Sequence, residues 1–145
     1  MLIEIKNDIQ EVARVCDQVE LFCAENAVST SKQHDIALIL DELITNVICY
    51  AYPNDIEHIF TLNIWVKGPM IHIKLADDGR EFNPLNKEDP DTASPLEERK
   101  IGGLGIFLVK RLSKSIKYSR VDGKNQLELE VSMEDGEDNG SKDNN

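Results

Sequence analysis

An apolar stripe between Ile36 and Ala51 constrains the fold of this chain more than any other segment. Its members recur every three or four positions, which at about 100° per residue places them on one side of a helix. They are Ile36, Ile39, Leu40, Leu43, Val47 and Ala51. The pattern therefore predicts a long helix with one face turned toward a core.

Two polar residues, Glu42 and Asn46, lie on the flank of this stripe. They are four residues apart, so they lie roughly 40° from each other around the helix axis. A carboxylate and a carboxamide in this position face the edge of a core or the mouth of a pocket. The pair suits an oxygen-ligated cation beside a general base. An ordinary polar pair at a core boundary has the same spacing, so the helix alone leaves both interpretations open.

A short strand and another helix are predicted before this helix. Residues Met1–Lys6 alternate as a short strand, and a helix of some five turns follows from Asp8, the predicted N-cap. The Ser29–Ser31 stretch ends that helix and offers caps for the next, which we expect to run to about Tyr52.

Four further strands are predicted from alternating apolar and polar residues. Two lie within residues 58–68 and 70–79, and two lie within 115–123 and 124–133 around the hairpin signal Asp122-Gly123. A long proline-bearing loop and a glycine-led helix separate the two pairs. This order predicts an α+β fold, a two-layer α/β sandwich whose mixed, mostly antiparallel sheet carries its helices on one face.

Composition restricts the classes of partner. The chain has 27 acidic and 16 basic side chains and a net charge of −11, which argues against a nucleic-acid surface or attraction to anionic membranes. Residues 134–145 lack apolar side chains and read as a disordered acidic tail. The three cysteines form no C-x-x-C motif, and no secretory or membrane-spanning segment is present. We expect a reduced, cytoplasmic protein.

A second chemical candidate is the segment Asp77-Asp78-Gly79. Asp77 continues the inward, apolar face of its strand, and an inward charge needs a partner or a ligand. Gly79 lets the backbone turn sharply or lets a flat ring approach closely. An aspartate can accept a hydrogen bond from an exocyclic amine. D-D-G is also common turn chemistry, so a strand-ending turn stays an alternative.

A third candidate is the run Gly102-Gly103-Leu104-Gly105 at a helix start. Free N–H groups and the positive end of the helix dipole favour an anion there, and glycines let phosphate oxygens reach the backbone. A flexible hinge would have the same composition. The run is neither a Walker A loop nor a Rossmann fingerprint.

In combination these motifs are more specific. A helix with E-x-x-x-N, a strand ending D-x-G-x-x-F, a proline-bearing loop and G-G-x-G before a helix resembles the GHKL (Bergerat-fold, histidine-kinase-like) ATP-binding superfamily. The closest resemblance is to the anti-sigma-factor serine/threonine kinases of bacterial partner-switching systems, and it spans residues 29–131. It implies a histidine-kinase-like ATP-binding domain over residues 1–133, with ATP and Mg²⁺ as ligands.

The resemblance also implies roles for individual residues. Glu42 corresponds to the general base, and Asn46 to the residue that holds Mg²⁺ through its amide oxygen. Asp77 corresponds to the aspartate that reads the adenine amino group, with Gly79 beside it. The residues expected at the phosphates are Gly102, Gly103, Leu104 and Gly105, with residues 83–101 as the lid.

The implied function is phosphorylation of a serine or threonine on a STAS-domain anti-anti-sigma protein, alternating with capture of a sigma factor. Such a protein is expected to form a homodimer and to bind neither nucleic acid nor membrane. A nucleotide-binding interaction module without kinase turnover is the alternative. A gyrase- or chaperone-type ATPase is a third interpretation, but it would need large transducer domains for which we expect no chain to remain.

The chain departs from the family pattern at two positions. Glu81 stands where D-x-G-x-G would have its second glycine, so we expect its side chain to narrow the pocket and to add negative charge. Tyr50 stands where a histidine often follows the asparagine. Arg99 and Lys100 precede the glycines, and contact with phosphates or a solvated loop are both open for them.

Overall fold

The computed structural model describes residues 1–54, 56–86 and 103–134. Its elements in chain order are β1 (Leu2–Lys6), α1 (Glu11–Glu25), α2 (Thr30–Asn46), the π-helix η1 (Val47–Ala51), β2 (Ile59–Lys67), β3 (Met70–Asp77), the 3₁₀ turn η2 (Pro84–Asn86), α3 (Gly103–Leu112), β4 (Ser115–Val121) and β5 (Lys124–Ser132). The predicted tail lies outside the described residues from position 135 onward, so its disorder stays a prediction.

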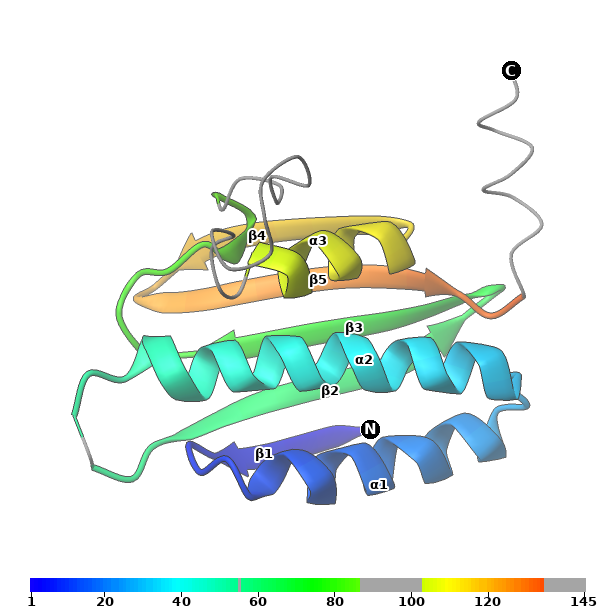
Figure 1. The fold of residues 1–145 in the computed structure, drawn as a ribbon, viewed down its shortest axis with the longest axis horizontal. Helices are drawn as coiled ribbons and strands as arrows, with labels where there is room; N and C mark the ends of the chain where they lie inside the picture. The colour runs from blue at the N-terminus through cyan, green and yellow to red at the C-terminus, as the bar shows by residue number, and fades with distance from the viewer. Residues whose placement is uncertain (55, 87–102, 135–145) are drawn as a thin grey trace, which may run out of the picture.

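The five strands form one sheet in the order β1-β2-β3-β5-β4. Each neighbouring pair is antiparallel, so the described sheet holds none of the parallel pairing of a mixed sheet. Figure 1 shows α1, α2 and α3 on the same face of this sheet. The predicted α+β two-layer sandwich with helices on one face is therefore confirmed.

The core lies between the helices and the sheet. Every member of the predicted α2 stripe is buried, from Ile36 at 0% exposure to Val47 at 7%. The strands contribute alternate residues, as their period of two requires. Buried strand side chains include Phe60, Leu62, Ile64, Ile71, Ile73, Leu75, Leu127, Leu129 and Val131. The apolar stripe of the helix and the alternate apolar residues of the strands thus face the same core.

One predicted cap is wrong and the other is confirmed. Asp8 does not cap α1, because its Oδ1 accepts a hydrogen bond from Gln10 N at 2.9 Å within a turn, and the helix begins at Glu11. Ser29 does cap α2, since its backbone is extended and its hydroxyl accepts from Lys32 N at 3.2 Å. A turn and an N-cap use the same Asp chemistry, which is why sequence reasoning chose the wrong one.

The end of the central helix differs in kind from the prediction. The helix extends through Ala51, but its last five residues, Val47–Ala51, form the π-helix η1. Single π turns inside helices are rare and frequently mark functional sites.

In the part of the chain that the structure describes, no helix has the length and apolar character required to cross a bilayer.

The packing of α2 yields a stability prediction with an internal control. Leu40 is 0% exposed whereas Leu38, on the same helix, is 39% exposed. Leu40→Ala should lower the free energy of unfolding by about 2–5 kcal/mol, because it removes buried methyl groups and leaves a cavity. Leu38→Ala should change it by less than about 0.5 kcal/mol. Urea denaturation measures both, and equal losses would contradict the described packing.

Candidate functional site

The site is built first around Asp77, the last residue of β3. Its side chain is 7% exposed, and its Oδ1 accepts hydrogen bonds from Gly79 N and Asn125 Nδ2, both at 2.9 Å. Burial raises the pKa of the Asp77 carboxyl, and the charge of Asp78 adds to that rise. The two hydrogen bonds and the Arg120 guanidinium act in the opposite direction. The inward orientation predicted from strand alternation is therefore correct.

The loop after Asp77 is fastened to the π-helix η1. A Cβ placed on Gly79 would overlap the carbonyl oxygen and side chain of Ala51, so only glycine fits here without movement. Arg80 N donates to Ala51 O at 2.8 Å, and Arg80 Nε donates to Tyr50 O at 2.6 Å. These bonds hold the segment 77–80 directly against the end of the helix that carries Glu42 and Asn46.

Asn46 is the second polar residue of the site. It is 6% exposed, and its Nδ2 is the one fully buried side-chain nitrogen or oxygen, among the described residues, that lacks a hydrogen-bond partner. A buried amide without a partner costs free energy, so such groups are rare unless a ligand or water satisfies them. Asn46 Nδ2 therefore remains an unused hydrogen-bond donor at this position.

Asn46 and Asp77 line the same pocket, which lies between α2 and the sheet. The other lining residues are Leu43, Val47, Ala51, Leu75, Phe82, Pro84, Tyr118, Asn125 and Leu127. Its walls are mostly apolar, and its few polar groups converge, as is typical of sites for small organic ligands. The pocket volume is about 30 Å³, so it admits water, and a larger molecule fits only if the lining side chains move.

Glu42 lies one helical turn before Asn46 and is half-buried. A Cβ on Gly105 would overlap the Glu42 carboxylate, so the first turn of α3 lies directly against this side chain. The structure thus brings Glu42 next to the predicted glycine run. Gly103 and Leu104 belong to the same first turn, whereas Gly102, Arg99, Lys100 and most of the predicted lid lie outside the described residues.

Two residues at the pocket were missed by sequence reasoning, Asn125 and Tyr118, whereas Phe82 is the last residue of the D-x-G-x-x-F motif. Asn125 on β5 is 5% exposed and lies opposite Asp77 in the strand register. A signal for it existed, because Asn125 is in phase with the inward residues Leu127 and Leu129. The same argument that singled out Asp77 applies to Asn125.

Glu81 does not narrow the pocket, and that expectation was wrong. Its side chain is exposed and is absent from the described residues that line the pocket, because the loop turns it outward. The negative charge of Glu81 nevertheless acts on a residue that lines the pocket. Burial, followed by the charge of Glu81, raises the pKa of the Tyr118 hydroxyl.

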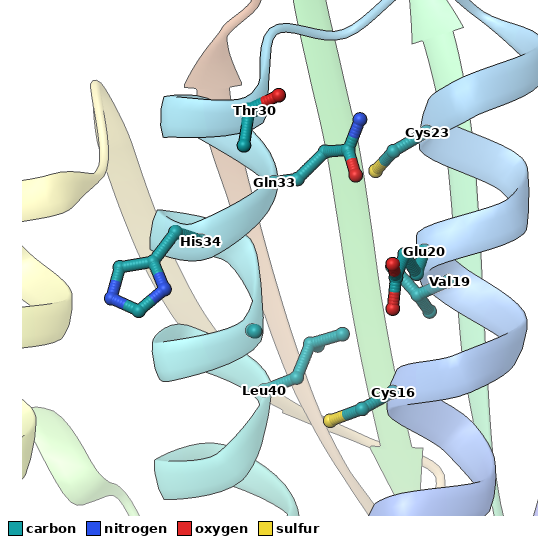
Figure 2. Close-up of a pocket in the computed structure, with 9 residues that line it drawn as sticks. Cys16, Val19, Glu20, Cys23, Thr30, Gln33, His34 and Leu40 are labelled. Carbon is teal, nitrogen blue, oxygen red and sulfur yellow. The ribbon is translucent and has the colours of Figure 1, made fainter.

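A larger cavity, of about 250 Å³, lies between α1 and α2 and holds none of the predicted site residues. Figure 2 shows Cys16 and Cys23 reaching into it from α1, and Gln33 and Leu40 from α2. Burial, aided by nearby carboxylates, raises the pKa of both thiols, and both are free cysteines. These thiols are therefore less reactive than ordinary ones, as expected of packing residues.

Within the described ranges, no three His, Cys, Asp or Glu side chains gather closely enough to hold a metal ion. A cation at this site would therefore take its oxygen ligands from Asn46, water and a bound phosphate, which is the usual situation for Mg²⁺. The unpartnered atom of Asn46 is the donor Nδ2, which cannot ligate a cation, so the amide would have to turn to bring Oδ1 to this position.

Comparison with known proteins agrees with this geometry. Residues 5–131 match the family described as histidine kinase-like ATPase domain. The chain belongs to this histidine kinase-like ATPase family. The matched span includes both halves of the pocket, and the GHKL resemblance read from the motifs is confirmed.

Among relatives, the serine/threonine-protein kinase BtrW of Bordetella bronchiseptica is 26% identical over 94 residues, which are 65% of this chain and 66% of BtrW. An anti-sigma F factor of Thermoanaerobacter sp. (strain X514) is 26% identical over 110 residues, which cover 75% of this chain and 76% of the relative. The chain thus spans just under two thirds of BtrW and about three quarters of the anti-sigma F factor.

The crystal structure of the RsbU and RsbW domains of a Mycobacterium tuberculosis protein aligns with a TM-score of 0.67. The alignment covers 91% of this chain and 32% of that one, at 15% sequence identity. At this identity the likeness establishes the shared fold.

The burial of Asp77 predicts a pH-dependent cost to stability. Because its folded-state pKa is raised above the ordinary value of 3.8, the folded protein holds this proton more tightly than the unfolded chain does. Stability conferred by the protonated group is fully present below pH 3.8 and is lost as the pH rises through the folded pKa. Asp77→Asn keeps the acceptor for Gly79 and Asn125 but cannot ionise.

Asp77→Asn should therefore become progressively more stable than the unaltered protein as the pH rises from 3.8. Denaturant unfolding at a series of pH values measures the difference between the two. A stability difference that stays constant over this range would contradict the raised pKa.

Proposed function

We propose that this protein is an ATP-dependent serine/threonine-protein kinase and anti-sigma factor that phosphorylates a STAS-domain antagonist and regulates transcription by partner switching. The observation that carries the proposal is the orphaned, buried amide of Asn46, which shares a pocket with the inward carboxylate of Asp77 and lies one turn from Glu42. Family membership supports nucleotide binding, and relatives named as serine kinases and an anti-sigma factor support the rest.

Asp77 is proposed to select the base. Its Oδ1 is engaged by two donors from the protein, which leaves Oδ2 to accept a hydrogen bond from the exocyclic amine of adenine. The apolar walls, among them Leu43, Leu75 and Leu127, suit a flat purine. Admission of the base requires some of the lining side chains to move, because the pocket volume is only about 30 Å³.

Asn46 is proposed to hold Mg²⁺ through its amide oxygen. When bound, the ion would neutralise phosphate charge and hold the triphosphate in place. The glycine run from Gly102 to Gly105, Leu104 included, is proposed to present backbone N–H groups to the phosphates at the start of α3. Because α3 lies against Glu42 through Gly105, this would place the γ-phosphate near that carboxylate.

Glu42 is proposed as the general base. It takes the proton of the substrate serine or threonine hydroxyl as the hydroxyl oxygen bonds to the γ-phosphorus, and the bond from γ-phosphorus to the bridging oxygen breaks to release ADP. Phosphoryl transfer depends mostly on positioning and charge neutralisation, so one well-placed carboxylate suffices as the proton acceptor. The glycine backbone N–H groups, and a cation when bound, would offset the negative charge of the phosphates.

The partners proposed are a STAS-domain anti-anti-sigma protein as substrate and a sigma factor as the alternative ligand. A homodimer is proposed on the family resemblance, and sedimentation of the purified chain would test it. We also propose residues 1–133 as the ATP-binding domain and 134–145 as its acidic tail. A module that binds nucleotide without transfer is the competing function, and the next experiment separates the two.

Glu42→Gln should lower phosphoryl transfer to a cognate STAS domain by about 10²–10⁴-fold, because the amide cannot accept the hydroxyl proton. ATP affinity, measured by calorimetry with Mg²⁺, should change by less than about twofold. Radiolabelled ATP follows the transfer. The matched control is Asp41→Asn, an exposed acid next to Glu42 on α2, which should transfer phosphate at the unaltered rate.

If the unaltered protein binds ATP but labels no STAS domain, the non-catalytic module is the correct function. If it takes up no ATP at millimolar concentration in the presence of Mg²⁺, both functions are wrong.

A further inference from the structure

Among the described residues that line the pocket, Asn125 has a side chain with several hydrogen-bond partners, and neither the motifs nor the family comparison assigns it a role. It lies on the inward face of β5, is 5% exposed, and faces Asp77 across the β3–β5 pair. An amide buried among Leu75, Leu127 and other apolar residues loses most of its hydration, so its hydrogen-bonding groups need partners within the protein. Its contacts show how.

Both amide hydrogens of Asn125 are used. Nδ2 donates to Asp77 Oδ1 at 2.9 Å and to the backbone carbonyl of Arg80 at 2.7 Å. On the other side, Oδ1 accepts from Tyr118 Oη at 2.5 Å and Arg120 Nη1 at 3.0 Å. The amide therefore connects the end of β3, the loop after it and the hairpin partner β4.

These partners determine which way the amide points. If the amide were flipped, its oxygen would face the carboxylate of Asp77 and the carbonyl of Arg80, which are both acceptors. Its NH₂ group would then face the Arg120 guanidinium, which is a donor only. The surroundings thus force Asn125 to present a donor to Asp77.

This orientation of the Asn125 amide determines which hydrogen bonds Asp77 can make with a ligand. Gly79 N and Asn125 Nδ2 both donate to Oδ1, and these two hydrogen bonds favour the ionised carboxylate against the burial that raises its pKa. A carboxylate held in this state offers only acceptors to a ligand. It pairs with an amino group at C6 of a purine, as in adenine, and repels the C6 carbonyl of guanine or hypoxanthine.

We propose that Asn125 is a specificity-determining positioning residue, which holds Asp77 as a pure acceptor and so restricts the site to 6-aminopurine nucleotides. The inference rests on the proposed function, since it presumes that Asp77 reads the base. The inference concerns base selection alone, so the ratio of the affinities for ATP and ITP tests it, and an activity measurement is not needed.

The decisive variant is Asn125→Asp, which has the same shape and keeps the acceptor for Tyr118 and Arg120. It places two carboxylates within hydrogen-bond distance, and such a pair shares a proton. Because Asp77 then carries this proton part of the time, its oxygens no longer act only as hydrogen-bond acceptors. ATP affinity should fall by about 10- to 100-fold, the amount expected when a hydrogen bond to a charged group is lost. ITP affinity should fall less or rise.

Calorimetry on the full chain with Mg²⁺ gives the ATP-to-ITP affinity ratio for each protein. Asn63→Asp is the matched control, because it makes the same substitution on strand β2, which β3 separates from β5, at a half-buried position that points away from the helices. Its ratio should equal that of the unaltered protein. A thermal melt checks that each variant is folded.

Tyr118→Phe serves as the second variant, should Asn125→Asp fail to fold. It removes the hydroxyl that donates to Asn125 Oδ1, so the amide is held less firmly. The ratio should fall by about 2- to 10-fold, as expected for loss of one neutral hydrogen bond.

An unchanged ATP-to-ITP affinity ratio in a folded variant would overturn the proposal. This holds even if both affinities fall, because an equal loss is what a purely structural role produces. If the unaltered protein binds neither nucleotide, the proposed function itself fails, and that outcome is distinct from a variant that binds both with the normal ratio.

Discussion

Burial of polar side chains at the apolar interface between α2 and the sheet is the constraint on which the rest of the site depends. Asn46, Asp77 and Asn125 are each no more than 7% exposed, and each would destabilise the fold unless its hydrogen-bonding groups were satisfied. Asp77 and Asn125 satisfy one another directly. Asn46 Nδ2 has no such partner among the described residues, and this unsatisfied donor is what supports the proposed ligand site.

The π-helix η1 connects the two halves of the pocket. Its carbonyl groups at Tyr50 and Ala51 accept hydrogen bonds from Arg80, so the loop that follows Asp77 is held against the helix that carries Asn46. Gly79 permits this contact because any side chain would collide with Ala51. Asp77 and Asn46 therefore share one pocket although they lie on different layers of the sandwich.

Much of this organisation was predictable because it depends on local patterns. Helical and strand periods identify the buried face of α2 and the alternate residues of β2 and β3, and Asp77 follows as the charged residue on an apolar face. The failures also have local causes. Asp8 forms a turn rather than a cap because the two motifs use the same side-chain hydrogen bond. Asn125 was missed although its phase with Leu127 was visible in the sequence.

The sequence by itself determined the order of elements, the face each buries, and the motif order that indicates the family, since these depend on the spacing of residues along one segment. Only the tertiary structure decided that Asn125 meets Asp77 and that Gly105 covers Glu42. Those contacts depend on the β3–β5 register and on the docking of α3 against α2. Register and docking are set by the combined packing of many distant side chains, and no single segment encodes them.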